Sequence, residues 1–413
     1  MSLEENHEGK RSKIIALLLS LLPVLMMYKT PLIGLGLSTT LVIIGSLFSF
    51  LIFITRCNKV YWKFIIPISV YLIYTIVKSV GSWTNFILYI AVLLNIITFS
   101  TDIVDSEALK KYIKIVSTIA AMAVIIQTLL YYVFSFHIPL IVSDFCMDSM
   151  KPYISLIKKG FGEGSSFYRP SAFFLEPAHF AQYTCIGLSF CLINDKPDYK
   201  NALIISVGVL LTTSGIGVAI VLFIWAWLLL TLMKSSGLRR RIRILFSAFI
   251  IGFIGILFAL QLSSVKIAVA RFLGSNYGGF TANQSSLLGR TLYWDKYISS
   301  LSGNVLIFGK GVLALPDVYF TGLMTIIYSC GIVGVVLFYF AIIRFVRYPS
   351  DILRCVALLY GGLMIVANIN GSISILFYLG MMLVLVAPLQ HKSKYDEIRS
   401  AETQNTEETK RLL

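Results

Sequence analysis

Residues 164–183 read GSSFYRPSAFFLEPAHFAQY, and they place an arginine, a glutamate and a histidine directly before a long apolar segment. Only 13% of the 413 residues are charged, so a cluster this polar stands out. In a chain of this kind, we expect charged groups to gather where a membrane meets water. The stretch therefore predicts the mouth of a cavity in a membrane-embedded bundle, and the functional site with it.

The composition excludes a water-soluble globular protein. Hydrophobic residues make up 57% of the chain and the mean hydropathy is +0.83, which leaves too little polar surface to cover a globule. Apolar runs of roughly 20 residues recur, which predicts an all-α polytopic membrane protein. The polar, partly acidic N-terminus lacks the features of a cleaved signal peptide, so the first apolar run is interpreted as a retained span.

The distribution of basic residues sets the expected topology and accounts for the net charge of +15. With the apolar segments assigned as spans, 24 of the 35 lysines and arginines fall on one side of the membrane. This excess is typical of cytoplasmic loops and does not call for a nucleic-acid partner. We therefore expect twelve spans in a lipid bilayer, with both termini in the cytoplasm. The spans are predicted at residues 14–28, 32–55, 64–78, 83–100, 113–135, 179–193, 201–213, 216–233, 244–262, 318–346, 352–368 and 372–389.

The spans divide the chain into six regions. These are a five-helix membrane region, a first large extracytoplasmic loop, central membrane helices with a broken hairpin, a second large extracytoplasmic loop, C-terminal membrane helices and a cytoplasmic tail. Their bounds, in that order, are 1–135, 136–178, 179–262, 263–317, 318–389 and 390–413. Both large loops lie on the outer side, so the functional site is expected there.

Two segments have lengths that do not suit a simple span. Segment 201–213 would be only about 20 Å long as a helix, short of the roughly 30 Å hydrocarbon core. It runs into the sequence TTSG at 212–215, which favours a broken helical hairpin that points outward. Segment 318–346 would be about 43 Å long, and residues 329–331 offer a kink between a short outer half and a true span.

The polar residues of 164–183 allow both a structural and a catalytic interpretation. Pro177 suits the first position of a helix, which places Glu176 and Arg169 close to the positive helix end. Glu176 can complement the helix dipole and pair with Arg169 as an interfacial anchor. It can equally be a carboxylate that orients or deprotonates a hydroxyl. His179, a lone histidine in the first helical turn, is interpreted as a packing residue.

The second outer loop is basic. It contains only two acidic residues, both aspartates, and five basic residues: Lys266, Arg271, Arg290, Lys296 and Lys310. Such a loop calls for an anionic partner, which is either phospholipid headgroups or a lipid diphosphate. The glycines on either side of Lys310 predict a flexible turn there, and Asp317 is expected to be the N-cap of the helix that follows.

The residue types also argue against other classes of protein. The four histidines are too scattered for a zinc site, and no group of outer-loop carboxylates suggests calcium or magnesium, so we expect no metal and no cofactor. A proton-coupled transporter would place Asp or Glu near mid-membrane, where this chain has almost none. The main intramembrane polar side chains are expected for the most part to form hydrogen bonds between helices; they are Asn85, Asn95, Gln127, Asn368 and Asn370.

Several of these motifs, in this order, resemble one family. Arg-x-x-x-Phe-x-x-Glu-Pro at 169–177 is similar to the signature of Wzy-type O-antigen and capsular polysaccharide polymerases and the related O-antigen ligases. Residues 212–217 resemble their Thr-x-Ser-x-x-Gly turn, 289–294 their Gly-Arg…Trp element and 309–311 their Gly-x-Gly. The resemblance spans roughly residues 165–345.

Membership of that family would imply a metal-independent glycosyltransferase at the outer face of a bacterial cytoplasmic membrane. Its substrates would be oligosaccharide repeat units on undecaprenyl diphosphate, and its partners a flippase and a chain-length regulator. Glu176, with Asp317 behind it, would then act on the acceptor hydroxyl. The resemblance implies diphosphate binding by four basic residues: Arg169, Arg290, Arg271 and Lys310.

Two alternatives stay open. One is an O-antigen ligase that moves glycan onto a lipid A core, although ligases carry a histidine where this chain has Asp317, which favours a polymerase. The other, which is not an enzyme, is a flippase or exporter of the same lipid-linked units. A flippase should show charged residues along a central cavity and short outer loops.

Overall fold

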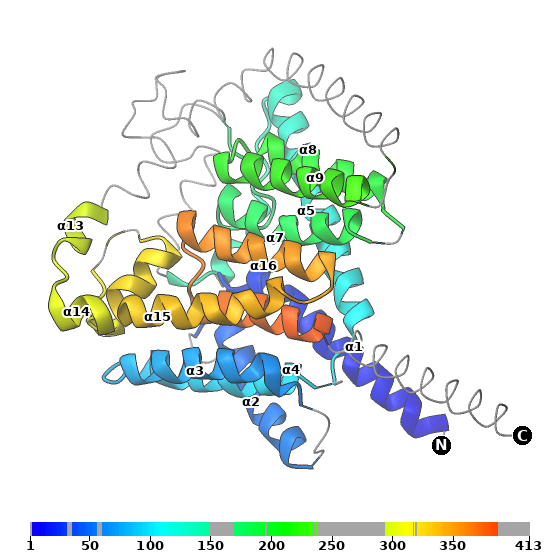
Figure 1. Ribbon diagram of the computed structural model, residues 1–413. Coiled ribbons are helices and arrows are strands. Elements are labelled where there is room, and N and C mark those ends of the chain that lie inside the picture. The colour runs from blue at the N-terminus through cyan, green and yellow to red at the C-terminus, as the bar shows by residue number, and fades with distance from the viewer. Residues whose placement is uncertain are drawn as a thin grey trace, which may run out of the picture.

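The computed structural model describes residues 2–30, 35–55, 60–101, 103–148, 168–194, 196–234, 237, 294–316, 318 and 320–386. Every regular element in these ranges is a helix, which confirms the predicted all-α class (Figure 1). The α-helices are α1 (Ser2–Leu25), α2 (Leu37–Thr55), α3 (Trp62–Lys78), α4 (Trp83–Phe99), α5 (Ser106–Phe134), α7 (Pro177–Leu192), α8 (Tyr199–Leu211), α9 (Gly215–Lys234), α13 (Trp294–Ile298), α14 (Gly303–Phe308), α15 (Gly322–Val346) and α16 (Asp351–Val366). Short 3-10 turns are η1 (Ser143–Phe145) and η4 (Val312–Ala314), and an unlabelled last helix is Ser372–Val386.

Several helices are long and apolar enough to span a membrane. Within the described ranges, α5, α9 and α15 meet this criterion by length and composition, and shorter apolar helical segments are Leu37–Ser49 of α2, α4, α8 and the last helix. Large apolar side chains also lie on the outside of the bundle, among them Leu47 (64% exposed) and Leu222 (65% exposed). An apolar exterior of this kind suits a lipid environment. The arrangement of twelve crossings stays a prediction, and the span at 244–262 lies outside the described residues.

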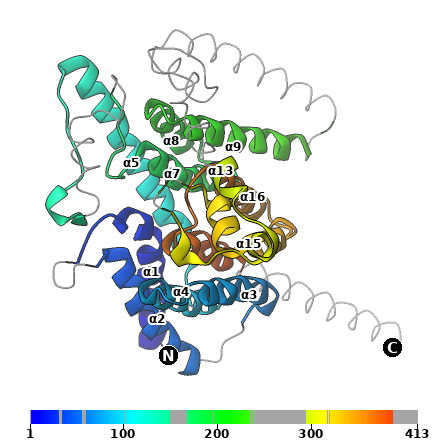
Figure 2. The same ribbon diagram turned by 90° about the vertical axis from the view of Figure 1, so that its left-hand side faces the viewer.

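The helices pack as two groups joined by α15 and α16 (Figure 2). On one side α2 packs on α4, α4 on α3, and α3 on α15. On the other side α16 packs on α7, and α7 contacts α5, α8 and α9. Aromatic contacts connect α3 to α15 along its length, with Phe64 stacked on Phe345 and Tyr71 edge-on to Phe338.

Helix α7 is the buried centre of the bundle. Every residue from Pro177 to Leu192 except His179 is buried, although the helix includes Gln182, Thr184 and Ser189. A helix that is buried on all sides has neighbours on every face. The polar stretch singled out in the sequence therefore leads directly into the central helix.

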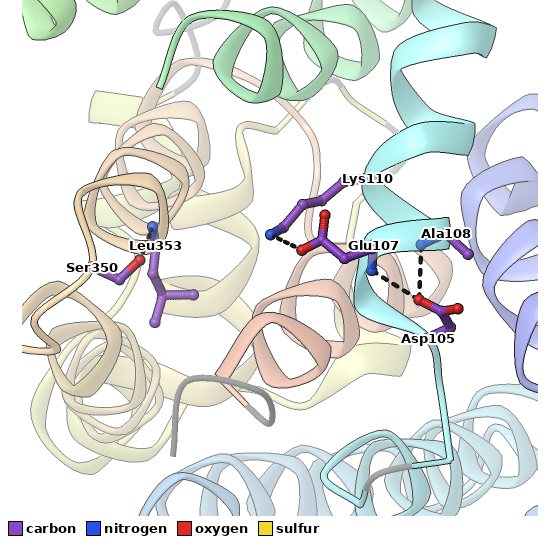
Figure 3. Close-up of polar contacts among 6 residues, drawn as sticks. All are labelled: Asp105, Glu107, Ala108, Lys110, Ser350 and Leu353. Carbon is purple, nitrogen blue, oxygen red and sulfur yellow. Dashed lines mark hydrogen bonds and ion pairs between the residues drawn. The ribbon is translucent and has the colours of Figure 1, made fainter. Parts of the chain in front are cut away.

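Local sequence explains where several helices begin. The Asp105 carboxylate accepts hydrogen bonds from the backbone N–H groups of Glu107 (3.0 Å) and Ala108 (2.9 Å), so it caps α5. Ser350 caps α16 in the same way through the N–H of Leu353 (Figure 3). Such caps satisfy backbone donors that the first helical turn leaves without a partner.

Both predicted helix breaks are confirmed. Helices α8 and α9 are separated by residues 212–214, and Trp225 Nε1 of α9 donates to Ser206 Oγ of α8 at 3.0 Å, as expected for a hairpin. In α15, Gly331 has non-helical angles (φ 69°, ψ −169°) and divides the helix into the predicted short first half and longer second half.

The predicted start of α15 is wrong. The helix begins at Gly322, and its N-cap is Thr321, whose side chain accepts from the N–H of Met324 at 3.4 Å. Asp317 therefore does not cap this helix, and it lies outside the described residues. Val318 and Phe320 extend the hydrophobic run of the sequence but are not helical, which is why the sequence placed the start too early.

Candidate functional site

Glu176 is the N-cap residue of α7, and Pro177 occupies the first helical position, as predicted. The backbone of Glu176 is extended (φ −137°, ψ 152°), and its carbonyl accepts from the N–H of Phe180 at 3.0 Å. The carboxylate makes no capping hydrogen bond to the helix. It is partly buried at the positive end of the central helix, where it can still contact a ligand.

Arg169 lies in a loop that Gln127 of α5 holds in place. The N–H of Ala172 donates to Gln127 Oε1 at 3.0 Å, and Gln127 Nε2 donates to the carbonyl of Ile138 at 2.8 Å. One buried amide thus ties both ends of the loop between α5 and α7 to α5, rather than bridging two helices as predicted. In the part of the chain that the structure describes, no ion pair joins Arg169 to Glu176.

An aromatic cluster supports the residue before Arg169. The ring of Tyr168 is stacked on Tyr131 with centroids 4.3 Å apart, and His137 meets it edge-on at 5.3 Å. Tyr168 is 2% exposed, and burial, with smaller contributions from Tyr131 and Tyr132, raises its pKa to about 12. The phenol therefore stays neutral, and the stacked rings fix the backbone that presents Arg169.

A partly open cavity of about 50 Å³ lies at the first turns of α7. Its polar lining is His179 and Gln182 from α7, with Asn368 and Ser374 from the segment that leads into the last helix. The rest of its wall is aromatic and aliphatic. His179, which the sequence suggested to be a packing residue, is thus a cavity residue. The predicted cavity at this stretch exists, although Glu176 does not line it.

The turn between α8 and α9 lies against the same helix. A Cβ on Gly217 would come 3.1 Å from Ala181 of α7, so the two helices approach closely here. Thr213 in this turn has φ +55°, which is unfavourable for a β-branched residue. It is 2% exposed, and its hydroxyl has no hydrogen-bond partner among the described residues. Backbone strain with a buried polar group is typical of functional turns.

Lys310 lies in a turn beside the break in α15. The sequence predicted a flexible turn here, but backbone hydrogen bonds hold this turn to α15. The N–H groups of Lys310 and Gly311 donate to the carbonyls of Tyr328 (2.8 Å) and Ser329 (2.9 Å), which end the first half of α15. Tyr74 of α3 donates to the carbonyls of Phe308 and Cys330 in the same place. The ammonium group of Lys310 lies 3.3 Å from the Tyr328 hydroxyl and 4.9 Å from the centre of its ring.

The structure brings together only part of the predicted site. Arg169 and Glu176 lie on one loop beside the cavity, whereas Lys310 contacts Tyr328 at the end of α15 where α13 and α14 pack (Figure 1). Arg271, Arg290 and Asp317 lie outside the described residues. Within the described ranges, no three histidine, cysteine, aspartate or glutamate side chains form a metal-binding group.

The fold defines an all-helical protein with several helices that are long and apolar enough to span a membrane, and with a mostly apolar cavity, partly lined by polar side chains, at the start of its central helix. Comparison with known proteins does not assign the chain to a family. No family model matches the sequence, and no curated protein matches it significantly.

Proposed function

We propose that this protein is a membrane glycosyltransferase that polymerises undecaprenyl-diphosphate-linked oligosaccharide repeat units at the outer face of a bacterial cytoplasmic membrane. The observation that carries the proposal is the position of the loop bearing Arg169 and Glu176 beside a polar-lined cavity at the start of α7. In so apolar a bundle, this is where the polar groups of a glycolipid can be held. The motif resemblance supplies the reaction.

The reaction is a single displacement at the anomeric carbon of the donor glycan. A hydroxyl of the acceptor unit attacks this carbon, the new glycosidic bond forms, and the bond to the diphosphate breaks. Glu176 accepts the hydroxyl proton, and undecaprenyl diphosphate leaves with its negative charge. The diphosphate is a good leaving group, so the protein chiefly positions two lipid-linked chains and stabilises the departing charge.

Arg169 is the described residue best suited to that charge. Its planar guanidinium can bind phosphate oxygens through two hydrogen bonds, which a lysine ammonium cannot do. The N-terminus of α7, eight residues further along the chain, adds the positive end of a helix dipole. Arg290 and Arg271 in the second outer loop, together with Lys310, are proposed to complete the diphosphate site.

The direct test is extension of purified lipid-linked repeat units by the purified protein alone. Formation of longer chains supports the proposal, and unchanged single units refute it. In cells, loss of a polymerase leaves single repeat units on the outer surface. Loss of a ligase instead leaves unattached long polymer, and loss of a flippase leaves units trapped inside.

Arginine variants test the diphosphate site. Arg169→Ala and Arg290→Ala should each abolish polymer while the protein remains in the membrane, and Arg169→Lys should restore little. The matched control is Arg354→Ala, because the side chain of Arg354 makes an exposed ion pair with Asp351 at 3.3 Å and no other ion pair among the described residues. Wild-type chain lengths in both site variants would contradict the proposed role of these arginines.

A further inference from the structure

The cavity at the start of α7 differs from an ordinary packing defect. It is lined by two side-chain amides, an imidazole and a hydroxyl, contributed by α7 and the segment 368–374. Protein interiors are close-packed, and cavities that stay empty are apolar. A water needs about 10–15 Å³ of such volume, so a cavity of about 50 Å³ holds about three to five waters or one polar substituent of a sugar.

The walls of the cavity are held by hydrogen bonds between distant parts of the chain. Tyr378 donates to the carbonyl of Gln182 at 3.0 Å, and Tyr183 donates to the carbonyl of Ser20 at 2.9 Å. Tyr71 donates to Asn370 Oδ1 at 3.2 Å, next to the lining segment. A cavity with fixed walls discriminates by size and by hydrogen bonding, because its groups do not rearrange around a poorly matched ligand.

The cavity also lies where the proposed acceptor must be. His179 and Gln182 are three residues apart and share one side of α7, and Glu176, the N-cap, precedes His179 by three residues. Three residues of helix advance about 4.5 Å. A sugar with one hydroxyl at Glu176 can therefore direct a neighbouring ring substituent toward His179 and Gln182. Aromatic walls with a few convergent polar groups are typical of small-molecule sites.

From this arrangement we infer that the cavity binds one polar ring substituent of the acceptor sugar, of the size of a hydroxymethyl or acetamido group, and so selects the sugar that accepts the growing chain. The inference rests on the proposed function. It assigns His179, Gln182, Asn368 and Ser374 to sugar recognition, whereas Arg169 serves the diphosphate that every lipid-linked unit shares. The sugar and the lipid diphosphate are therefore recognised by different residues.

The test compares binding of two probes to the purified full-length protein by native mass spectrometry. One probe is the lipid-linked repeat unit extracted from the source bacterium, and the other is bare undecaprenyl diphosphate. Gln182→Met keeps the volume and the backbone carbonyl that Tyr378 contacts, but it removes the amide. It should lower the preference for the sugar-bearing lipid about tenfold, the effect of one or two lost hydrogen bonds. Arg169→Ala should weaken binding of both probes.

Two further variants keep the test independent of folding. Ser374→Ala removes only a hydroxyl from the cavity and should reduce the same preference. Thr184→Val is the matched control, since Thr184 lies on α7 outside the cavity and bonds only to the carbonyl of Phe180. Melting temperatures without lipid identify any variant that fails to fold. Wild-type preference in both folded cavity variants would overturn the inference.

The outcome separates this inference from the proposed function. A wild-type protein that extends repeat units, with unchanged preference in the cavity variants, overturns the sugar site alone. A wild-type protein that binds the sugar-bearing lipid without extending it, and loses its preference in Gln182→Met, overturns polymerisation but supports the sugar site. Failure of the wild-type protein to bind either probe overturns both.

Discussion

Replacing Gly331 with alanine should destabilise the protein through the contact between the break in α15 and the turn at 309–311. Gly331 has φ +69° and ψ −169°, a region that is essentially restricted to glycine. A Cβ at this position would lie 2.6 Å from the backbone nitrogen of Gly309 and even closer to the carbonyl of Ile307. Both obstacles are backbone atoms, so no side-chain movement can relieve the overlap.

The expected cost follows from these two effects. The unfavourable backbone angles cost about 1–3 kcal/mol, and forcing a methyl group against packed backbone costs about 1–3 kcal/mol more. The free energy of unfolding should therefore fall by about 2–6 kcal/mol. Unfolding entropy of roughly 2.1 cal/mol/K per residue, applied to 413 residues, converts this into a melting-temperature decrease of about 2–7 °C.

The assay is thermal unfolding of the detergent-solubilised protein at a fixed heating rate, with amide hydrogen exchange of residues 303–316 as a local readout. Gly362→Ala is the matched control, because Gly362 lies within α16 and nothing lies within 4 Å of its Cβ position. Alanine there should raise the melting temperature by about 1 °C or leave it unchanged, since it favours a helix over glycine by about 1 kcal/mol.

Unchanged melting temperature and unchanged exchange in Gly331→Ala would refute this account of the α15 break. A second check is the double variant with Gly309→Ala. Gly309 has φ +75°, and its Cβ would lie 2.5 Å from the backbone nitrogen of Cys330, so it disturbs the same contact from the other side. The double variant should therefore lose less free energy of unfolding than the sum of the losses in the two single variants.

Three further variants test the site. Gln127→Ala should lower the free energy of unfolding by about 2 kcal/mol, since two hydrogen bonds to the backbone of the loop between α5 and α7 are lost, and should speed amide exchange at 168–175; unchanged exchange there would contradict the anchoring role. Thr213→Gly should raise stability by about 1 kcal/mol in thermal unfolding, because it removes left-handed strain and a buried hydroxyl without a described partner; a loss of stability would contradict this. Glu176→Gln should stop polymer formation but leave lipid-linked units bound in native mass spectrometry, and wild-type chain lengths would exclude Glu176 as the base.

Apolar segments predicted the described helices well because most helical residues are apolar and the turns between them carry the polar and glycine residues. The segment predicted at 216–233 is the helix Gly215–Lys234, and the predicted break at 329–331 occurs at Gly331. Pro177 marked the start of α7 because a proline has no N–H to lose at a first helical position. Helix ends set by local chemistry are readable from the sequence.

Features that depend on contacts between distant residues were not readable. The turn around Lys310 was predicted to be flexible because glycines flank it. Its backbone N–H groups nevertheless donate to the carbonyls of Tyr328 and Ser329, which lie just before the break in α15. The cavity combines α7 with residues 368–374, which lie almost 200 positions further along the chain. Gln127 was expected to join helices, and no local pattern indicated that it joins the two ends of a loop.

One backbone hydrogen bond connects the start of α15 to the segment that lines the cavity. The N–H of Gly322 at the start of α15 donates to the carbonyl of Ala367 at 2.7 Å, and Asn368 in the cavity wall follows directly. The first half of α15, from Gly322 to the break at Gly331, therefore contacts two regions. Its start is bonded to the residue before the cavity wall, and Tyr328 near its end contacts Lys310. Moving Gly322 relative to Ala367 would therefore break this bond or shift the residue that precedes Asn368 in the cavity wall.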